Sequence, residues 1–96
     1  MAKLARYEEV IYLYALRYAM QRRTNALSNV TDCMEKRIKE FSEFFLHQAK
    51  IESQALLETS GMKRTMDDCD VDMHKRLQRM CKTELERRDE RDIHRH

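Results

Sequence analysis

The chain has few of the residues that break helices, and its cysteines do not have the number or spacing that would stabilise a very small fold through disulfides or zinc. It has no proline and one glycine in 96 residues, so the turns that punctuate a β-rich domain are not encoded. Its three cysteines are odd in number and lack the Cys-x-x-Cys or cysteine and histidine spacing of a zinc site. Such cysteines are usual as small apolar residues in reducing compartments. We therefore expect helix nearly throughout, reduced thiols, and no metal or other cofactor.

An excess of one charge sign and a long apolar run are also missing. The 19 basic and 17 acidic residues give a formal net charge of +2, which argues against a large nucleic-acid footprint. No run of 18 apolar residues is present, and Arg6, Glu8 and Glu9 interrupt the region where a leader would have its apolar segment. We therefore expect a cytoplasmic protein that does not enter a membrane.

The spacing of apolar residues predicts three helices in a single domain over residues 1–96. They are expected at residues 4–23, 29–60 and 65–90, with a solvated, frayed tail at 91–96. The pattern leaves open whether the first two helices are continuous, although a shift of the apolar face favours a turn between them. Three amphipathic segments with short connections predict an all-α fold, either a three-helix bundle or a long helical hairpin with a third docked helix.

The first predicted helix is apolar around nearly its whole circumference. At about 100° per residue, one face carries Leu4, Tyr7, Val10, Ile11, Tyr14 and Tyr18, and the remainder carries Tyr12, Leu13, Leu16 and Met20. A helix of this kind is buried on more than one side, either as a central bundle helix or against a second copy. We expect the tyrosine face in the core and the second group on an apolar surface that binds a second copy or another protein.

One charged residue, Arg17, interrupts this apolar helix. Its guanidinium can lie over a tyrosine ring or pair with a carboxylate of a neighbouring helix, such as Glu40 or Glu43. The alternative is an exposed basic patch that binds phosphate groups of a nucleic acid or an acidic partner surface. The members of that patch would be Arg17, Arg22, Arg23, Lys36 and Arg37.

Two clusters look like metal sites but have the wrong spacing. Residues 67–74, DDCDVDMH, begin like a calcium loop, yet Met73 stands where glycine is needed and Arg79 where the bidentate glutamate belongs. Glu43 and His47 are four residues apart, whereas di-iron helices use a Glu-x-x-His spacing on two helices. No glycine-rich phosphate loop, nucleophile elbow or H-E-x-x-H motif is present. We therefore do not expect an enzyme.

The stretch YALRYA at residues 14–19, followed by RRT at 22–24, carries a family resemblance. It resembles a run of the type A-L-R-Y-A-L-G-R-R-T near the start of small phage and prophage proteins of undefined role. The resemblance implies a phage accessory protein that modulates host machinery or host defence in the host cytoplasm. The expected function is non-enzymatic binding of another protein, with self-association into a homodimer, and nucleic-acid binding is the alternative.

Overall fold

The computed structural model describes residues 3–21, 26–63 and 68–94. In chain order its elements are α1 (Arg6–Gln21), α2 (Ala26–Lys36), the 3₁₀ helix η1 (Ile38–Glu40), α3 (Glu43–Lys63) and α4 (Asp68–His94). Within those ranges the chain forms no strand, which confirms the predicted all-α class. None of the described helices carries an apolar stretch of the length that crossing a bilayer requires.

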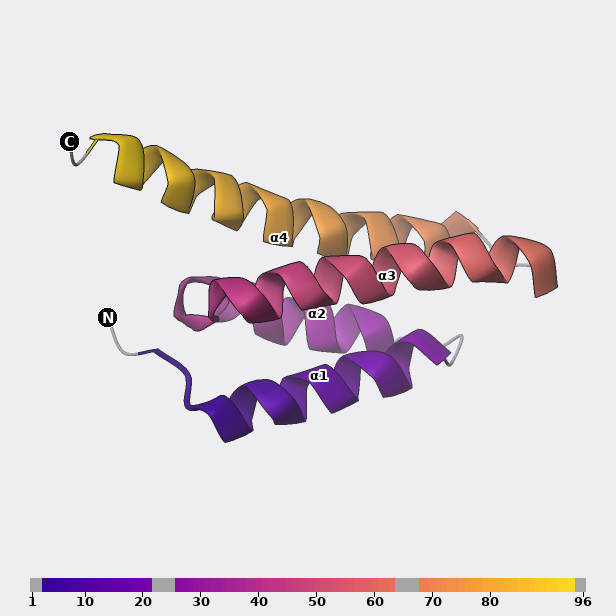
Figure 1. The fold of residues 1–96 in the computed structure, drawn as a ribbon. Helices are drawn as coiled ribbons and strands as arrows, with labels where there is room; N and C mark the ends of the chain where they lie inside the picture. The colour runs from indigo at the N-terminus through magenta and orange to yellow at the C-terminus, as the bar shows by residue number, and fades with distance from the viewer. Residues whose placement is uncertain (1–2, 22–25, 64–67, 95–96) are drawn as a thin grey trace.

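The four α-helices alternate in direction and form an elongated slab of 47 × 25 × 17 Å (Figure 1). α1 packs against α2 and α3, and α4 packs against the same two helices from the opposite side. α1 and α3 run in the same direction, whereas α2 and α4 run back (Figure 1). The start of α1, the 3₁₀ helix, the start of α3 and the end of α4 therefore meet at one end of the slab, which we call the η1 end.

The predicted second helix at 29–60 is two helices rather than one. α2 ends at Lys36, and the extended backbone of Phe41 (φ −75°, ψ 146°) separates η1 from α3. The break turns Phe41 into the core, where its ring meets Tyr12 edge-on at 5.1 Å and stacks on Phe45 at 4.5 Å between centroids. No proline or glycine marks this break, so local sequence does not reveal it.

Helix boundaries differ from the prediction at other points as well. α3 continues past residue 60, the predicted end of the second helix, to Lys63. α4 continues to His94, four residues beyond the predicted end of the third helix at residue 90. The predicted end of the first helix, the start of the third at residue 65 and the last two residues lie outside the described ranges.

α1 faces the core with the opposite side from the predicted one. Leu16, Ala19 and Met20 are buried, with exposed fractions of 0, 1 and 5%, whereas Tyr7 and Tyr14 are exposed. Tyr12 and Leu13 are partly buried against the same core, so the prediction of an outer surface made of Tyr12, Leu13, Leu16 and Met20 is wrong. Leucine, methionine and alanine bring no polar atom into the core, while an outward tyrosine keeps its hydroxyl in water.

The core is formed by residues of all four α-helices and by Leu4 and Phe41, which lie outside them. Its buried apolar members are Leu4, Leu16, Ala19, Met20, Leu27, Met34, Phe41, Phe45, Leu46, Ala49, Leu77, Cys81 and Leu85. Burial raises the pKa of the Cys81 thiol to about 12, which keeps it protonated and confirms its predicted use as a small apolar residue. Cys33 is exposed and does not serve in this way, and the side chain of Cys69 lies outside the described ones.

A small polar network is buried between α3 and α4. The Ser53 hydroxyl lies 2.9 Å from Nδ1 of His74, and Gln78 Nε2 donates to the Ser53 hydroxyl at 3.1 Å. Ser53 and His74 are both buried, so their polar groups satisfy one another inside the bundle. Although the pair resembles a hydrolytic dyad, its side chains are only 0 and 1% exposed, and their hydrogen bond joins the two helices.

The buried imidazole predicts a loss of stability in mild acid. Burial lowers the pKa of His74, so below about pH 6.5 the unfolded chain binds a proton that the folded chain does not. The stabilisation that the folded chain gains from a neutral His74 is therefore complete above about pH 6.5. It declines as the pH falls from there toward the lower pKa of His74 in the folded chain. Urea unfolding at pH 7.5 and 5 should show a decrease that is smaller in His74→Gln. Parallel pH profiles for the parent and the variant would contradict this assignment.

Candidate functional site

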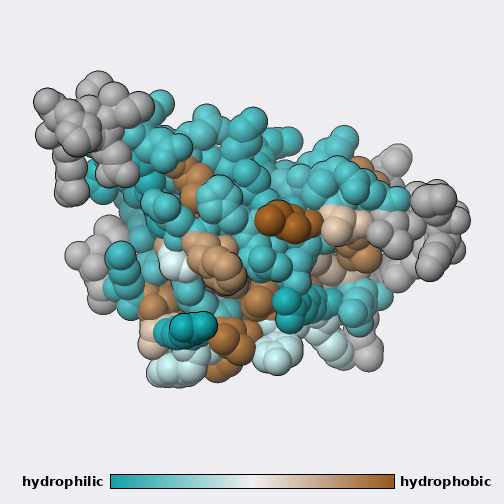
Figure 2. Space-filling model, in the orientation of Figure 1, coloured by the Kyte–Doolittle hydropathy of each residue, from teal (hydrophilic) through white to brown (hydrophobic). Residues whose placement is uncertain are grey.

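Large apolar side chains remain exposed on two neighbouring helices. Among the described residues, those exposed are Tyr7, Val10, Ile11, Tyr14 and Tyr18 of α1 and Phe44 and Ile51 of α3. Their exposed fractions lie between 43 and 77%, and we call this set the α1/α3 surface. Figure 2 shows hydrophobic residues gathered over the lower part of the molecule, where α1 lies, and a mostly hydrophilic surface over α4.

The α1 part of this surface forms a ridge along the helix. Tyr7, Ile11, Tyr14 and Tyr18 recur at intervals of three and four residues, which places them on one side of α1. That side is opposite the buried Leu16. We call these four residues the tyrosine ridge. Tyrosine suits such a position because its ring offers apolar contact area while its hydroxyl tolerates water.

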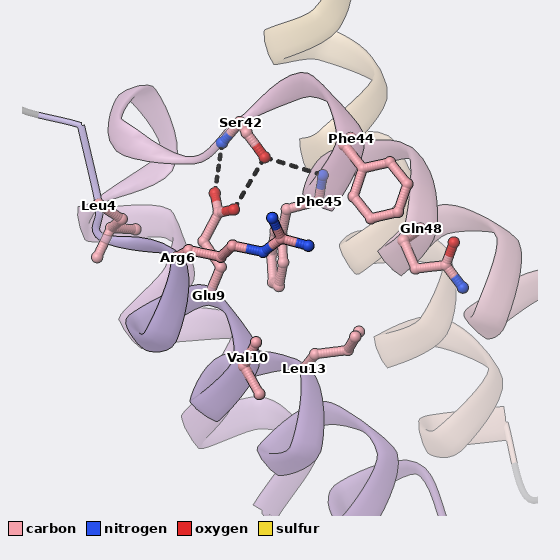
Figure 3. Close-up of a pocket in the computed structure, with 9 residues that line it drawn as sticks. All are labelled: Leu4, Arg6, Glu9, Val10, Leu13, Ser42, Phe44, Phe45 and Gln48. Carbon is pink, nitrogen blue, oxygen red and sulfur yellow. Dashed lines mark hydrogen bonds between the residues drawn. The ribbon is translucent and has the colours of Figure 1, made fainter.

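A groove with a volume of about 460 Å³ runs along one side of the ridge, between α1 and α3 (Figure 3). It is lined by Leu4, Arg6, Glu9, Val10, Leu13, Ser42, Phe44, Phe45 and Gln48. In Figure 3, Val10 and Leu13 of α1 face Phe44 of α3 across the groove. The Arg6 side chain extends from α1 over the groove toward α3. The groove is therefore mainly apolar, with charge near one end.

Hydrogen bonds to Glu9 fix the spacing of the two groove walls. Oε2 of Glu9 accepts from the Ser42 backbone N–H at 2.6 Å, and Oε1 accepts from the Ser42 hydroxyl at 2.9 Å (Figure 3). The Ser42 hydroxyl in turn accepts from the Phe45 N–H at 3.2 Å and so caps α3. Because one carboxylate of α1 holds the first turn of α3, the groove is preformed.

A second, open hollow lies on the other side of the ridge, between α1 and α2. Its volume is about 630 Å³, and its lining includes Tyr14, Ala15 and Tyr18 of α1 with Ala26 and Val30 of α2. The tyrosine ridge is thus flanked by a depression on each side. This alternation of ridge and groove is the shape that packed helices present to one another.

Arg17 makes both kinds of contact that the sequence predicts. Its Nε donates to Oε1 of Glu52 at 2.6 Å, and its guanidinium carbon lies 6.0 Å from the centre of the Tyr14 ring. The acidic partner is Glu52 and not the predicted Glu40 or Glu43, because α1 and α3 run in the same direction and residues late in α1 lie beside the middle of α3. The Arg17 side chain is 45% exposed, so the pair contributes at most about 1 kcal/mol.

The predicted basic patch is not gathered into one surface by the described residues. Nη1 of Arg37 lies 3.3 Å from Glu8, and Nη2 lies 3.3 Å from Glu40, whose hydrogen bond raises the arginine pKa. Glu8 and Arg17 are separated by roughly 13 Å along α1, so the two arginines serve different ends of the helix. Lys36 is exposed at the end of α2. The predicted members Arg22 and Arg23 lie outside the described residues.

Two members of the α1/α3 surface were missed in the sequence because they fall in the apolar stripe of the predicted second helix. Phe44 and Ile51 are seven residues apart on α3 and share its outer face. The sequence shows the three- and four-residue spacing of the tyrosine ridge, but it does not show whether the ridge faces the core or the solvent.

In the part of the chain that the structure describes, no three histidine, cysteine or carboxylate side chains are grouped to hold a metal ion. Comparison of the chain with protein-family models, with curated proteins and with solved structures finds no match.

Proposed function

We propose that this chain is a non-enzymatic helical protein that acts by binding protein, and that its α1/α3 surface binds a second copy of the chain. The observation that carries the proposal is that the exposed large apolar side chains of the described residues all belong to α1 and α3. Contiguous apolar surface with several aromatic rings is typical of protein interfaces, and it is unfavourable to leave in water.

The size of the surface suits a stable dimer. Four of its members are aromatic and 56 to 77% exposed. At roughly 200 Å² for a whole aromatic side chain, these rings alone offer roughly 500 Å². Adding Val10, Ile11 and Ile51 brings the area toward the roughly 800 Å² that each partner buries in an interface of standard size.

The shape of the surface favours a second copy as its occupant. A two-fold axis crossing α1 would bring two ridges together in opposite directions, with each ridge entering a depression beside the other. Each copy supplies both a ridge and its flanking grooves, as an isologous interface requires. Arg17, which lies beside the ridge, is already paired with Glu52, so this arginine would not be buried without a partner.

The resemblance of residues 14–24 to small phage and prophage proteins supports a biological setting for this binding. In that setting the protein is a phage-encoded modulator or inhibitor of host machinery or defence, and it acts in the host cytoplasm. The same apolar surface would contact the host target, so self-association and target binding would compete. Its action would be by occupancy of a partner surface and not by chemistry on a substrate.

Sedimentation equilibrium at micromolar concentration tests the dimer directly. The parent chain should show the mass of a dimer. Ile11→Glu should weaken self-association by about a hundredfold, because two carboxylates would be buried near the two-fold axis. Lys75→Glu, an equally drastic change at an exposed position of α4, is the matched control and should leave the dimer intact. A parent chain that remains monomeric, or an unaffected Ile11→Glu dimer, would exclude this interface.

A further inference from the structure

A second surface feature, a strongly basic pocket, lies at the η1 end. Its volume is about 460 Å³, and its lining includes five cationic side chains, Lys3, Lys39, Arg87, Arg88 and Arg91, and one acidic side chain, Glu43. These residues come from the segment before α1, from η1, from the start of α3 and from the last turns of α4. The fold therefore gathers charges that are far apart in the sequence.

Two of the arginines are held in place by a buried carboxylate. Glu84 is 5% exposed, and its oxygens accept from Nε and Nη2 of Arg87 at 3.0 and 2.6 Å. Nε of Arg88 donates to the same carboxylate at 2.9 Å, and its Nη2 donates to the backbone oxygen of Phe41 at 2.6 Å. Nη1 of each guanidinium makes no hydrogen bond within the described part of the chain. Glu84 therefore fixes the orientation of both guanidinium groups at the pocket.

The remaining cations of the pocket have no carboxylate partner among the described residues. Lys3, Lys39 and Arg91 are exposed and form no ion pair with any described residue. Even when Glu43 and the buried Glu84 are counted, the pocket holds three more cations than carboxylates. Like charges held this close repel one another, and a bound anion with several charges would remove that repulsion.

We propose that this pocket binds the phosphate group of a small phosphorylated ligand of about nucleotide size. Lys3, Lys39 and Arg91 would contact the phosphate oxygens, and Arg87 would donate from Nη1. Arginine forks suit the tetrahedral oxygens of phosphate, and lysines add charge without a fixed geometry. The volume falls within the roughly 300 to 1,000 Å³ of small-molecule sites and exceeds what one inorganic ion fills.

A small ligand fits this site better than a nucleic-acid chain. The cations converge on one pocket, whereas proteins that bind nucleic acid present basic residues as an extended patch or stripe along the backbone path. The pocket uses no member of the tyrosine ridge, so the proposal goes beyond protein binding and does not depend on it. A monomeric Ile11→Glu chain should retain the pocket.

Calorimetric titration with ATP, pyrophosphate and adenosine tests the proposal. ATP and pyrophosphate should bind and adenosine should not, and Lys39→Ala and Arg91→Ala should each weaken ATP binding by about tenfold. Both side chains are exposed and without a described partner, so the variants should melt like the parent. Lys36→Ala and Lys75→Ala, at exposed positions outside the pocket, are the matched controls and should bind normally.

Three results would overturn the proposal. The first is an unchanged ATP affinity in Lys39→Ala and Arg91→Ala. The second is binding of adenosine as strong as that of ATP, because recognition would then not depend on phosphate. The third is affinity for single-stranded DNA that grows with its length and exceeds that for ATP, which would assign the basic residues to a nucleic-acid backbone. Repeating the ATP titration with Ile11→Glu shows whether phosphate binding is independent of self-association.

Discussion

Replacing Arg88 with alanine should lower the free energy of unfolding by about 2 to 4 kcal/mol. The Arg88 side chain is only 17% exposed, and it pairs with the buried carboxylate of Glu84. Its Nη2 also donates to the backbone oxygens of Ile38 and Lys39, both at 3.4 Å, and of Phe41 at 2.6 Å. One guanidinium therefore closes the junction between η1 and α3 onto α4. Urea unfolding followed by circular dichroism measures the loss.

Arg87 provides the matched control for this prediction. It binds the same Glu84 carboxylate through two nitrogens, but it makes no described bond to the backbone, and its side chain is 36% exposed. Arg87→Ala should therefore cost about 1 kcal/mol or less. Arg88→Lys should recover little of the lost stability, because an ammonium lacks the planar fork that reaches Glu84 and the carbonyls together. Equal, small losses in Arg87→Ala and Arg88→Ala would show that Arg88 does not hold the junction.

The same junction explains why the sequence predicted the helical class but not the number of helices. The stripe over residues 29–60 is continuous, and nothing local breaks it. The break is stabilised by bonds between distant residues, since Glu9 binds Ser42 and Arg88 binds the Phe41 carbonyl. Bonds across more than 30 residues leave no trace in a local apolar period. Tertiary contacts override helix propensity here.

The orientation of α1 could not be obtained from its sequence for a different reason. Periodicity locates an apolar face by contrast with a polar one, and α1 has apolar residues on both sides. The choice follows from the chemistry of the residues, because Leu16 and Met20 pack without a polar atom while Tyr14 keeps a hydroxyl in water. An all-round apolar helix with tyrosines on one side is better interpreted as tyrosine outward.

The candidate sites show the same limit. The sequence predicts the kinds of contact that Arg17 makes, since both an aromatic and an acidic partner are found. The identity of Glu52 depends on how α1 aligns with α3, which no local pattern fixes. The basic pocket was not predicted at all, because its cations come from three separate segments: the residues before α1, η1 and the last turns of α4.

Alanine substitutions at two phenylalanines three residues apart should distinguish a residue that stabilises the fold from one that belongs to the α1/α3 surface. Phe41 is 2% exposed and packs between the rings of Tyr12 and Phe45, so Phe41→Ala should lower the free energy of unfolding by about 3 to 5 kcal/mol. Phe44 is 77% exposed and borders the groove beside α1. Phe44→Ala should change stability by no more than about 0.5 kcal/mol.

Self-association should respond to Phe44 even though folding does not. Removing an exposed aromatic ring from the proposed interface should weaken the dimer by about tenfold in sedimentation equilibrium. Unfolding must be measured at protein concentrations where the dimer has dissociated, because association would otherwise add to the apparent stability. If Phe41→Ala leaves too little folded protein, Phe41→Leu keeps most of the apolar volume and should still be clearly less stable than the parent. Similar stability losses for Phe41→Ala and Phe44→Ala would contradict the difference in burial on which the two roles depend. A dimer of unchanged affinity in Phe44→Ala would show that Phe44 of α3 is not part of the interface.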